Sequence, residues 1–212
     1  MGSLVFRIAG GGSSTCADGS WVSGKVGSYA LEFNGTDEYV TAGTDINGDF
    51  TSKLTVAAWV KPGLAGNDNH VIAGQWNYGT SKRGWELRLI DSTGKIEVGA
   101  TRNGTWTTPY LATQATTALS ADTWYHVVAV YDCSTSPATP KIYINGSAET
   151  LSSNTSTGVN FDIGGNVAGG NITLTLGAYW YNSSTVEHFD GNIDEVGVWN
   201  VVLDSGAIGE LY

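Results

Sequence analysis

The sequence contains little cysteine, the residue that forms disulfides and binds metal through its thiolate. It has two cysteines, Cys16 and Cys133, and their spacing is not the paired spacing of a zinc site. Either they form one disulfide or they stay as two thiols, because the sequence does not give the distance between them. A single methionine and few leucines also disfavour a helical bundle.

Basic charge is scarce as well. Lys and Arg number 10 against 20 Asp and Glu, which gives a net charge of −10. An acidic chain repels phosphate groups, so neither nucleic acid nor an anionic membrane surface is an expected partner. The same carboxylates suit a hard cation such as Ca²⁺.

Long apolar runs are absent too. None approaches the ~18 residues that a membrane span needs, so we expect no membrane insertion. The chain is rich instead in Ser, Thr and Asn, with 29 glycines and 11% aromatic residues. Thr, Val, Tyr and Trp favour strands, while Gly and Asn form turns. All-β sandwiches often fill this length as one domain, so we expect a single domain over residues 1–212.

Apolar and polar residues alternate with a period of two along much of the chain, which predicts strands. Turn pairs such as Asn34-Gly35, Asn47-Gly48, Asn103-Gly104 and Asn145-Gly146 separate many of them. Residues 10–19 and 152–170 read as loops, and 203–212 as a short helix that Ser205 could cap. The expected strands are 29–33, 39–42, 54–61, 70–75, 85–90, 95–101, 124–131, 141–144, 172–177 and 193–199.

The strand at 124–131 has large apolar residues on both faces, which predicts a central position in a sheet. His126 on this strand is expected to be a packed histidine with one satisfied nitrogen, rather than a ligand or a base. Trp59 is likewise expected in the core.

Four segments, in order, carry a family resemblance. They are 28–40, 54–62, 123–132 followed by 141–146, and 176–178 with 189–200. Together they resemble the concanavalin A-like laminin-G (LamG) family of bacterial and viral surface proteins, over residues 24–212. The resemblance implies an all-β fold, a two-sheet antiparallel jelly-roll β-sandwich, often with a structural Ca²⁺.

Asp194 is a carboxylate inside an apolar strand, and burying it is costly unless it is paired, hydrogen-bonded or bound to metal. The resemblance implies that this position binds Ca²⁺ together with the N-terminal hairpin. The implied ligands are Asn34, Gly35, Asp37 and Asp194, with Asn34 where the family usually has Asp. The alternative is a purely hydrogen-bonded Asp194.

Aromatic residues gather at expected strand ends and loops beside amide and guanidinium groups. Aromatic faces stack on sugar rings, and loops on a rigid scaffold commonly carry binding residues. The alternative is that several rings cap the sandwich. The candidate ligand-binding residues are Trp76, Tyr78, Trp85, Arg88, Trp106, Tyr179, Trp180 and Tyr181.

Catalysis finds little support. Retaining glycosidases need two nearby carboxylates, and the Glu-x-Asp-x-x-Glu string of laminarinase-type enzymes is missing. The sequence favours a carbohydrate-binding or adhesive module, extracellular or on a cell or virion surface, within a larger multidomain or virion protein. Its partner would be a glycan or cell-surface polysaccharide. The alternatives are a glycanase or lyase on the same fold and a structural shell or appendage protein.

Overall fold

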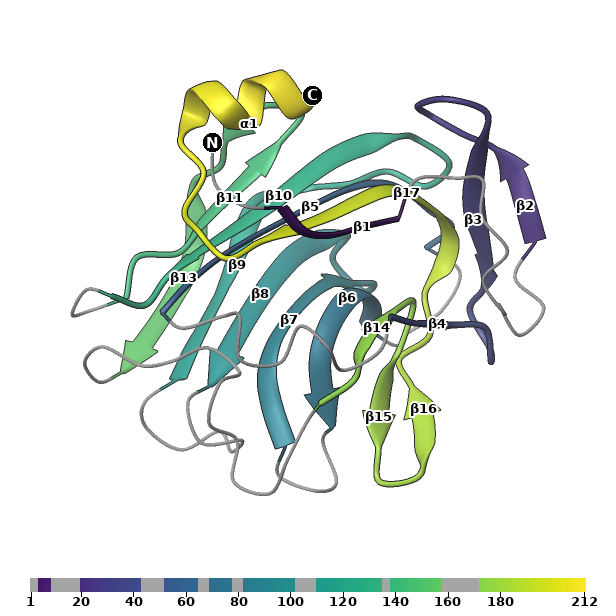
Figure 1. Ribbon diagram of the computed structural model, residues 1–212, viewed down its shortest axis with the longest axis horizontal. Coiled ribbons are helices and arrows are strands. Elements are labelled where there is room, and N and C mark those ends of the chain that lie inside the picture. The colour runs from purple at the N-terminus through teal and green to yellow at the C-terminus, as the bar shows by residue number, and fades with distance from the viewer. Residues whose placement is uncertain are drawn as a thin grey trace.

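The computed structural model describes residues 4–8, 20–42, 52–64, 69–77, 82–101, 110–134, 138–157 and 172–212. Two antiparallel sheets pack face to face, with the hydrophobic core between them (Figure 1). This arrangement confirms the all-β jelly-roll sandwich that the sequence predicts. We call the two layers sheet A and sheet B.

The strands of each sheet come from distant parts of the chain. Along sheet A the order is β12 (Ser147–Ala148), β11 (Lys141–Ile144), β10 (Tyr125–Asp132), β5 (Lys53–Pro62), β17 (Asp190–Trp199), β3 (Tyr29–Asn34) and β2 (Ser20–Ser23), with β1 (Leu4–Ile8) also paired to β17. Along sheet B the order is β13 (Leu151–Thr157), β9 (Tyr110–Ala118), β8 (Lys95–Thr101), β7 (Lys82–Ile90), β6 (Asn69–Asn77), β14 (Leu174–Leu176) and β4 (Val40–Thr41). A hairpin of β15 (Tyr179–Tyr181) and β16 (Ser184–Val186) joins sheet B beside β6.

Strand β10 is central, as its two apolar faces predict, and lies between β5 and β11. Val127 and Tyr131 point into the main core, whereas Val128 and Val130 point outward beneath the C-terminal helix. Successive side chains of a strand point to opposite faces, so a strand with two apolar faces needs a cover on each side. Here one cover is sheet B and the other is the helix.

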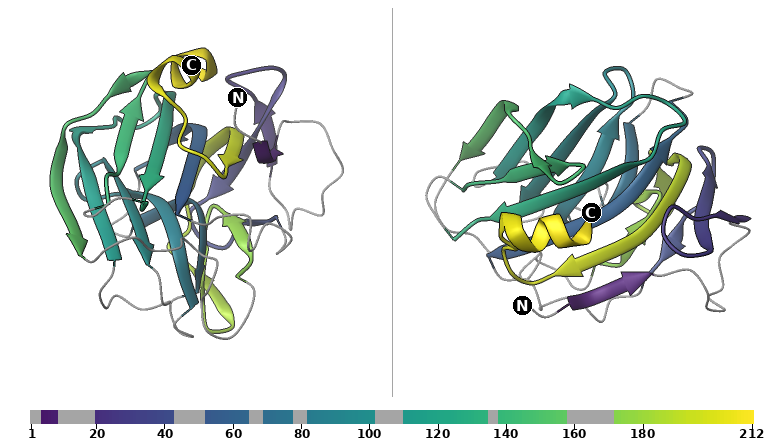
Figure 2. Two further views of the ribbon diagram at one scale, coloured as in Figure 1. Left: turned by 60° about the vertical axis from the view of Figure 1, so that its left-hand side comes forward. Right: turned by 90° about the horizontal axis from the view of Figure 1, so that it is seen from above.

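That helix, α1 (Ser205–Leu211), lies across the outside of sheet A (Figure 2). Its only buried residue is Ile208, which packs against Val128, Val130 and Tyr143. The predicted cap is wrong by one residue. Asp204, not Ser205, adopts the extended cap conformation, and its side chain accepts a hydrogen bond from the backbone N–H of Ala207 at 2.9 Å.

Two of the described turns follow the sequence signals, whereas Asn34-Gly35 leads from β3 of sheet A toward β4 of sheet B and forms no hairpin. Asn145 and Gly146 have φ of 51° and 75°, as a two-residue hairpin turn requires. The turn at 91–94 joins β7 to β8 and ends on Gly94, whose φ is 66°. The predicted turns at Asn47-Gly48 and Asn103-Gly104 lie outside the described residues.

Seven strands within the described ranges were not expected from the pattern: β1, β2, β9, β12, β13, β15 and β16. Strand β13 also corrects the loop predicted for residues 152–170, of which 158–170 lie outside the described residues. Strand β9 is rich in Thr and β13 in Ser and Thr, so neither shows a clear apolar alternation. Strand β13 ends the sheet and pairs with β9 only. The predicted loop at 10–19 lies outside the described part of the chain.

Cys133 is buried and carries a free thiol, so the structure does not contain the disulfide that was one of the two alternatives. Burial, with a smaller effect from Asp132, raises the pKa of the Cys133 thiol to about 12. Cys16 lies outside the described residues. Among the described residues, no helix has the length and apolar character needed to cross a membrane.

Candidate functional site

A row of polar side chains crosses the outer face of sheet B. Strand pairing sets Arg88 of β7 opposite Glu97 of β8, and Glu97 opposite Gln114 of β9. These positions alternate with core residues of the same strands, so their side chains point away from the core. Glu187, just after β16, and Tyr179 of β15 extend the row beyond β6. We call these five residues the polar row.

Hydrogen bonds join the polar row from end to end. Arg88 donates from Nε to Glu97 Oε1 at 2.9 Å and from Nη1 to Glu187 Oε2 at 3.4 Å. Gln114 Nε2 donates to Glu97 Oε2 at 2.6 Å, and Tyr179 Oη donates to Glu187 Oε1 at 2.7 Å. The row is therefore held in one arrangement before any ligand arrives.

Glu187 has a left-handed backbone with φ of 54°, which costs a non-glycine residue about 1–3 kcal/mol. Its carbonyl accepts a hydrogen bond from the backbone N–H of Val71 at 3.0 Å, which ties it to β6. Strain of this kind often gathers at functional sites. Here the strained residue is the one whose carboxylate accepts a hydrogen bond from Arg88.

The polar row is negatively charged overall. One guanidinium faces Glu97, Glu187 and Glu86, whose Oε1 lies 3.7 Å from Arg88 Nε. Burial lowers the pKa of Arg88, but the three carboxylates outweigh burial and raise it above its ordinary value. Burial and then Glu187 raise the pKa of Tyr179, so its hydroxyl stays a donor. The side chains of Arg88, Glu97 and Glu187 are 17%, 13% and 22% exposed, which leaves the row open to a ligand.

Three of the predicted aromatic residues, Trp76, Trp85 and Tyr179, are buried. Trp85 is 0% exposed, belongs to the main core and donates from Nε1 to Gln75 Oε1 at 2.9 Å. Trp76 is 1% exposed and packs with Val71, Tyr179 and Val186. Neither indole presents an open face to solvent. Tyr78 and Trp106 lie outside the described residues.

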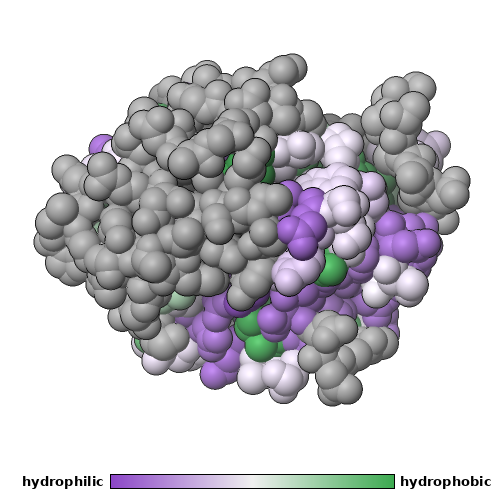
Figure 3. All heavy atoms as spheres, turned by 90° about the horizontal axis from the view of Figure 1, so that it is seen from below, coloured by the Kyte–Doolittle hydropathy of each residue, from purple (hydrophilic) through white to green (hydrophobic). Residues whose placement is uncertain are grey.

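The hairpin β15–β16 carries the accessible rings. Trp180 is half-buried and meets Tyr39 edge to face, with ring centroids 5.8 Å apart. Tyr181 is 45% exposed. Asn77 and Asn182 exchange two hydrogen bonds, of 3.3 and 3.2 Å, which hold the hairpin tip against the end of β6. The hairpin projects at the lower end of the molecule in Figure 1, and the described surface seen from that end is mostly hydrophilic (Figure 3).

The carboxylate of Asp194 is satisfied by backbone donors. Its Oδ2 accepts hydrogen bonds from the N–H groups of Lys25 at 2.9 Å and Val26 at 3.0 Å. Its Oδ1 accepts one from the N–H of Glu195 at 2.8 Å. These bonds stabilise a buried anion without a metal ion.

The structure does not bring the four predicted calcium ligands together. Asn34 pairs with Asp190, and Asp194 lies four residues farther along β17, about 13 Å away at ~3.3 Å per residue. The side-chain oxygen of Asn34 already accepts hydrogen bonds within its own turn, and its amide donates to Asp37 Oδ1 at 2.9 Å. Gly35 packs against the Asp190 side chain.

Within the described residues, no group of three or more His, Cys, Asp or Glu side chains could hold a metal ion. The separation of Asp194 from the Asn34 turn does not fit the calcium site that the resemblance implies. Calcium binding by the protein stays a prediction.

Glu97, Gln114 and Glu187 belong to the site but were missed from the sequence. Glu97 could have been identified from the sequence. The turn at 91–94 fixes the register of β7 on β8, and that register places Glu97 opposite Arg88. Gln114 follows in the same way from the next pairing. Glu187 could not be found, because its approach to Arg88 depends on a hairpin from a distant part of the chain.

Comparisons with known proteins agree with this architecture. A family model described as the concanavalin A-like lectin/glucanases superfamily matches residues 34–209. No curated protein matches the sequence.

Solved structures share the fold at low sequence identity. Domain 4 of AbnA, a GH43 extracellular arabinanase from Geobacillus stearothermophilus in complex with arabinotriose, is 20% identical, with a TM-score of 0.61 over 91% of this chain and 80% of that one. The CBM40 domain of Ruminococcus gnavus IT-sialidase, bound to α2,3-sialyllactose, is 12% identical, with a TM-score of 0.63 over 86% and 97%. The ligand-binding domain of botulinum neurotoxin serotype D with N-acetylneuraminic acid is 12% identical, with a TM-score of 0.68 over 99% and 50%. At these identities the likeness is one of fold.

Proposed function

Because this chain belongs to the concanavalin A-like lectin/glucanase superfamily, we propose that it is a carbohydrate-binding module. Its binding face is the polar row of sheet B with the rings of hairpin β15–β16. The observation that carries the proposal is the polar row itself, five polar groups joined by hydrogen bonds on an outward face. Four of the five are partly open to solvent, and the fifth, Tyr179, is buried. The solved structures that share the fold include domains with bound oligosaccharides, which supports the same class of function.

The chemistry of the row suits sugar hydroxyls. Ionised carboxylates such as Glu97 and Glu187 accept hydrogen bonds only, and each has lone pairs beyond those that Arg88 occupies. Neighbouring hydroxyls on a sugar ring can supply the donors. Tyr181 offers an exposed aromatic face beside the row, on which the C–H face of a sugar can stack.

The charge of the row favours a neutral oligosaccharide. One cation faces the two carboxylates of the row and the adjacent Glu86, which leaves a formal excess of negative charge, so an acidic sugar would meet repulsion. Arg88 is also engaged by Glu97 and Glu187, and an anionic ligand would have to break those bonds. We therefore propose a neutral pentose or hexose oligomer rather than a sialylated one. Such a module would act outside the cell, as a surface or secreted domain of a larger protein.

The test is calorimetric titration of the full chain with arabinotriose, cellotriose and sialyllactose. We expect binding of a neutral trisaccharide and none of sialyllactose. Tyr181→Ala should weaken binding about threefold to tenfold, and Gln114→Ala by a similar factor, since each removes an interaction of about 1 kcal/mol. Tyr29→Ala is the matched control, because Tyr29 is 51% exposed on sheet A.

Three results would contradict the proposal. One is a preference for sialyllactose over every neutral oligomer. The second is equal affinity for Tyr181→Ala, Gln114→Ala and the unchanged protein. The third is the appearance of reducing ends or unsaturated products, which would indicate a glycanase or lyase instead of a binding module.

A further inference from the structure

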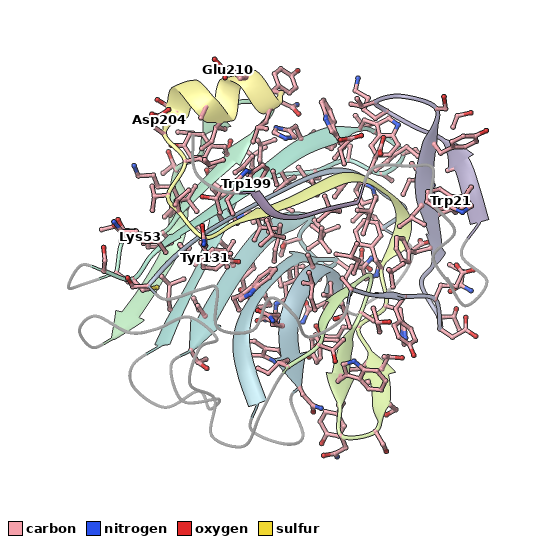
Figure 4. All side chains as sticks on the ribbon, viewed as in Figure 1. Trp21, Lys53, Tyr131, Trp199, Asp204 and Glu210 are labelled. Atoms are coloured by element: carbon pink, nitrogen blue, oxygen red, sulfur yellow. The ribbon has the colours of Figure 1, made fainter. Side chains whose placement is uncertain are left out.

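A cavity lies on the side of the molecule opposite the polar row, between the outer face of sheet A and helix α1. Its volume is about 320 Å³, at the lower end of the range for small-ligand pockets, ~300–1,000 Å³. In Figure 4, Trp199 lies on sheet A below the helix that carries Glu210. The lining residues that matter are Trp59, His126, Glu195, Gly197, Trp199 and Glu210. We call this hollow the helix cavity.

Aromatic rings form the walls of the helix cavity. Trp59 stacks on Tyr212, with centroids 5.5 Å apart and planes at 27°. The His126 ring lies 5.2 Å from that of Trp59. Trp199 lies across Gly197, where an added Cβ would overlap the ring carbon Cη2. A glycine at this position thus lets one indole lie flat on the strand.

Two carboxylates add negative charge to these walls. Glu210 comes from α1 and Glu195 from β17. The pairing of β17 with β5 is irregular between Asp194 and Gly197, and Glu195 has a left-handed φ of 47° in that stretch. A bulge of this kind re-aims a side chain, and here it accompanies the placement of Glu195 in the cavity wall.

A cation of the chain itself already lies at this wall. The Nζ of Lys25 is 4.8 Å from the centroid of the Trp59 ring. An ammonium is attracted to the electron-rich face of an indole. His126 does not compete as a cation near neutral pH, because burial lowers its pKa to about 4.

We propose that the helix cavity is a second binding site, which takes one amino-sugar residue with a free ammonium group, such as glucosamine. The sugar ring packs on the partly exposed indole of Trp199. Its ammonium replaces that of Lys25 over the buried Trp59, at the wall that carries Glu210 and Glu195. An N-acetylated or neutral sugar lacks the charge that this wall selects. The cavity and the polar row lie on different sheets, so this site stands or fails apart from the proposed function.

The test is titration of the full chain with the glucosamine dimer, followed by tryptophan fluorescence or calorimetry. We expect Lys25→Met to bind the dimer about threefold more tightly, since the competing ammonium is gone. A gain of affinity cannot arise from misfolding. The Glu210→Gln variant should bind the dimer at least fivefold more weakly. Glu32 is an exposed residue of β3, and the Glu32→Gln variant should bind the dimer with the affinity of the unchanged protein.

The comparison ligands decide the chemistry. The N,N′-diacetyl dimer should bind at least tenfold more weakly than the free amine, and Nα-acetyl-lysine amide should also bind weakly because it lacks the ring. Equal binding of the acetylated dimer, or tighter binding of the lysine amide, would overturn the proposal. So would Lys25→Met and Glu210→Gln variants that bind like the unchanged protein. Tyr181→Ala should leave this binding unaltered, which separates the two sites.

Discussion

Protonation of His126 should make the protein less stable in acid by a defined amount. His126 is 3% exposed, its Nδ1 is buried without a hydrogen-bond partner, and burial lowers its pKa from 6.5 to about 4. The unfolded chain therefore takes up a proton as the pH falls below 6.5, while the folded protein does not until about pH 4. The free energy of unfolding must fall across that interval and level off below it.

The size of this loss follows from the two pKa values. With 6.5 unfolded and about 4 folded, His126 should remove about 2.5 kcal/mol of stability between pH 7 and pH 4.5. A His126→Phe variant keeps a ring against Trp59 and keeps the backbone N–H that donates to Asn145 Oδ1. It should lack this pH-dependent loss, whatever its stability at pH 7.

The assay is denaturant unfolding of both proteins at half-unit steps from pH 7 to pH 4.5. Lys25, Glu195 and Glu210, which face this region, are the same in both proteins, so their contributions cancel in the difference. NMR titration of the ring protons gives the folded pKa directly, and the chain has only three histidines to assign. Parallel stability curves, or a folded His126 that titrates near 6.5, would refute the reasoning.

The remaining predictions concern two aspartates whose side chains accept hydrogen bonds from backbone N–H groups. Asp194→Asn should lower the free energy of unfolding by about 2–3 kcal/mol, because it weakens charge-assisted bonds to three backbone N–H groups. Thermal melts should give the same loss in calcium and in EDTA, whereas a loss seen only with calcium would assign Asp194 to a metal. Asp204→Ala should cost about 1 kcal/mol in chemical denaturation, and Ser205→Ala much less. If the two alanine variants lose equal stability, the observed cap is wrong.

Much of the fold is visible in the sequence because alternation and turn chemistry act locally. Strands β8 and β11 match their expected ranges, and the two apolar faces of β10 correctly predict a central strand. The polar strands β9 and β13 escape this reasoning. Strand β9 is placed by its pairing with β8 and buries only Leu111 and Ala115 in the main core, and β13 is placed by its pairing with β9.

The site was harder to predict because it depends on which strands become neighbours. Arg88 was identified as a candidate, but two of its three carboxylate partners come from β8 and from the segment after β16. The same limit explains the calcium set, since the register of β17 on β3 pairs Asn34 with Asp190 rather than with Asp194. Composition alone also cannot separate a core indole such as Trp85 from one on the surface.

Along each strand of sheet B, residues that face the core alternate with residues that face outward. Trp85, Leu87 and Leu89 fill the core, while Glu86 and Arg88 alternate with them on the other side. Substitutions at the outward positions can change what the surface recognises and leave the packing beneath intact. A single inserted residue in β7 would do the reverse, since every side chain beyond it would change sides. Divergent relatives should therefore vary in outward residues far more readily than in strand length.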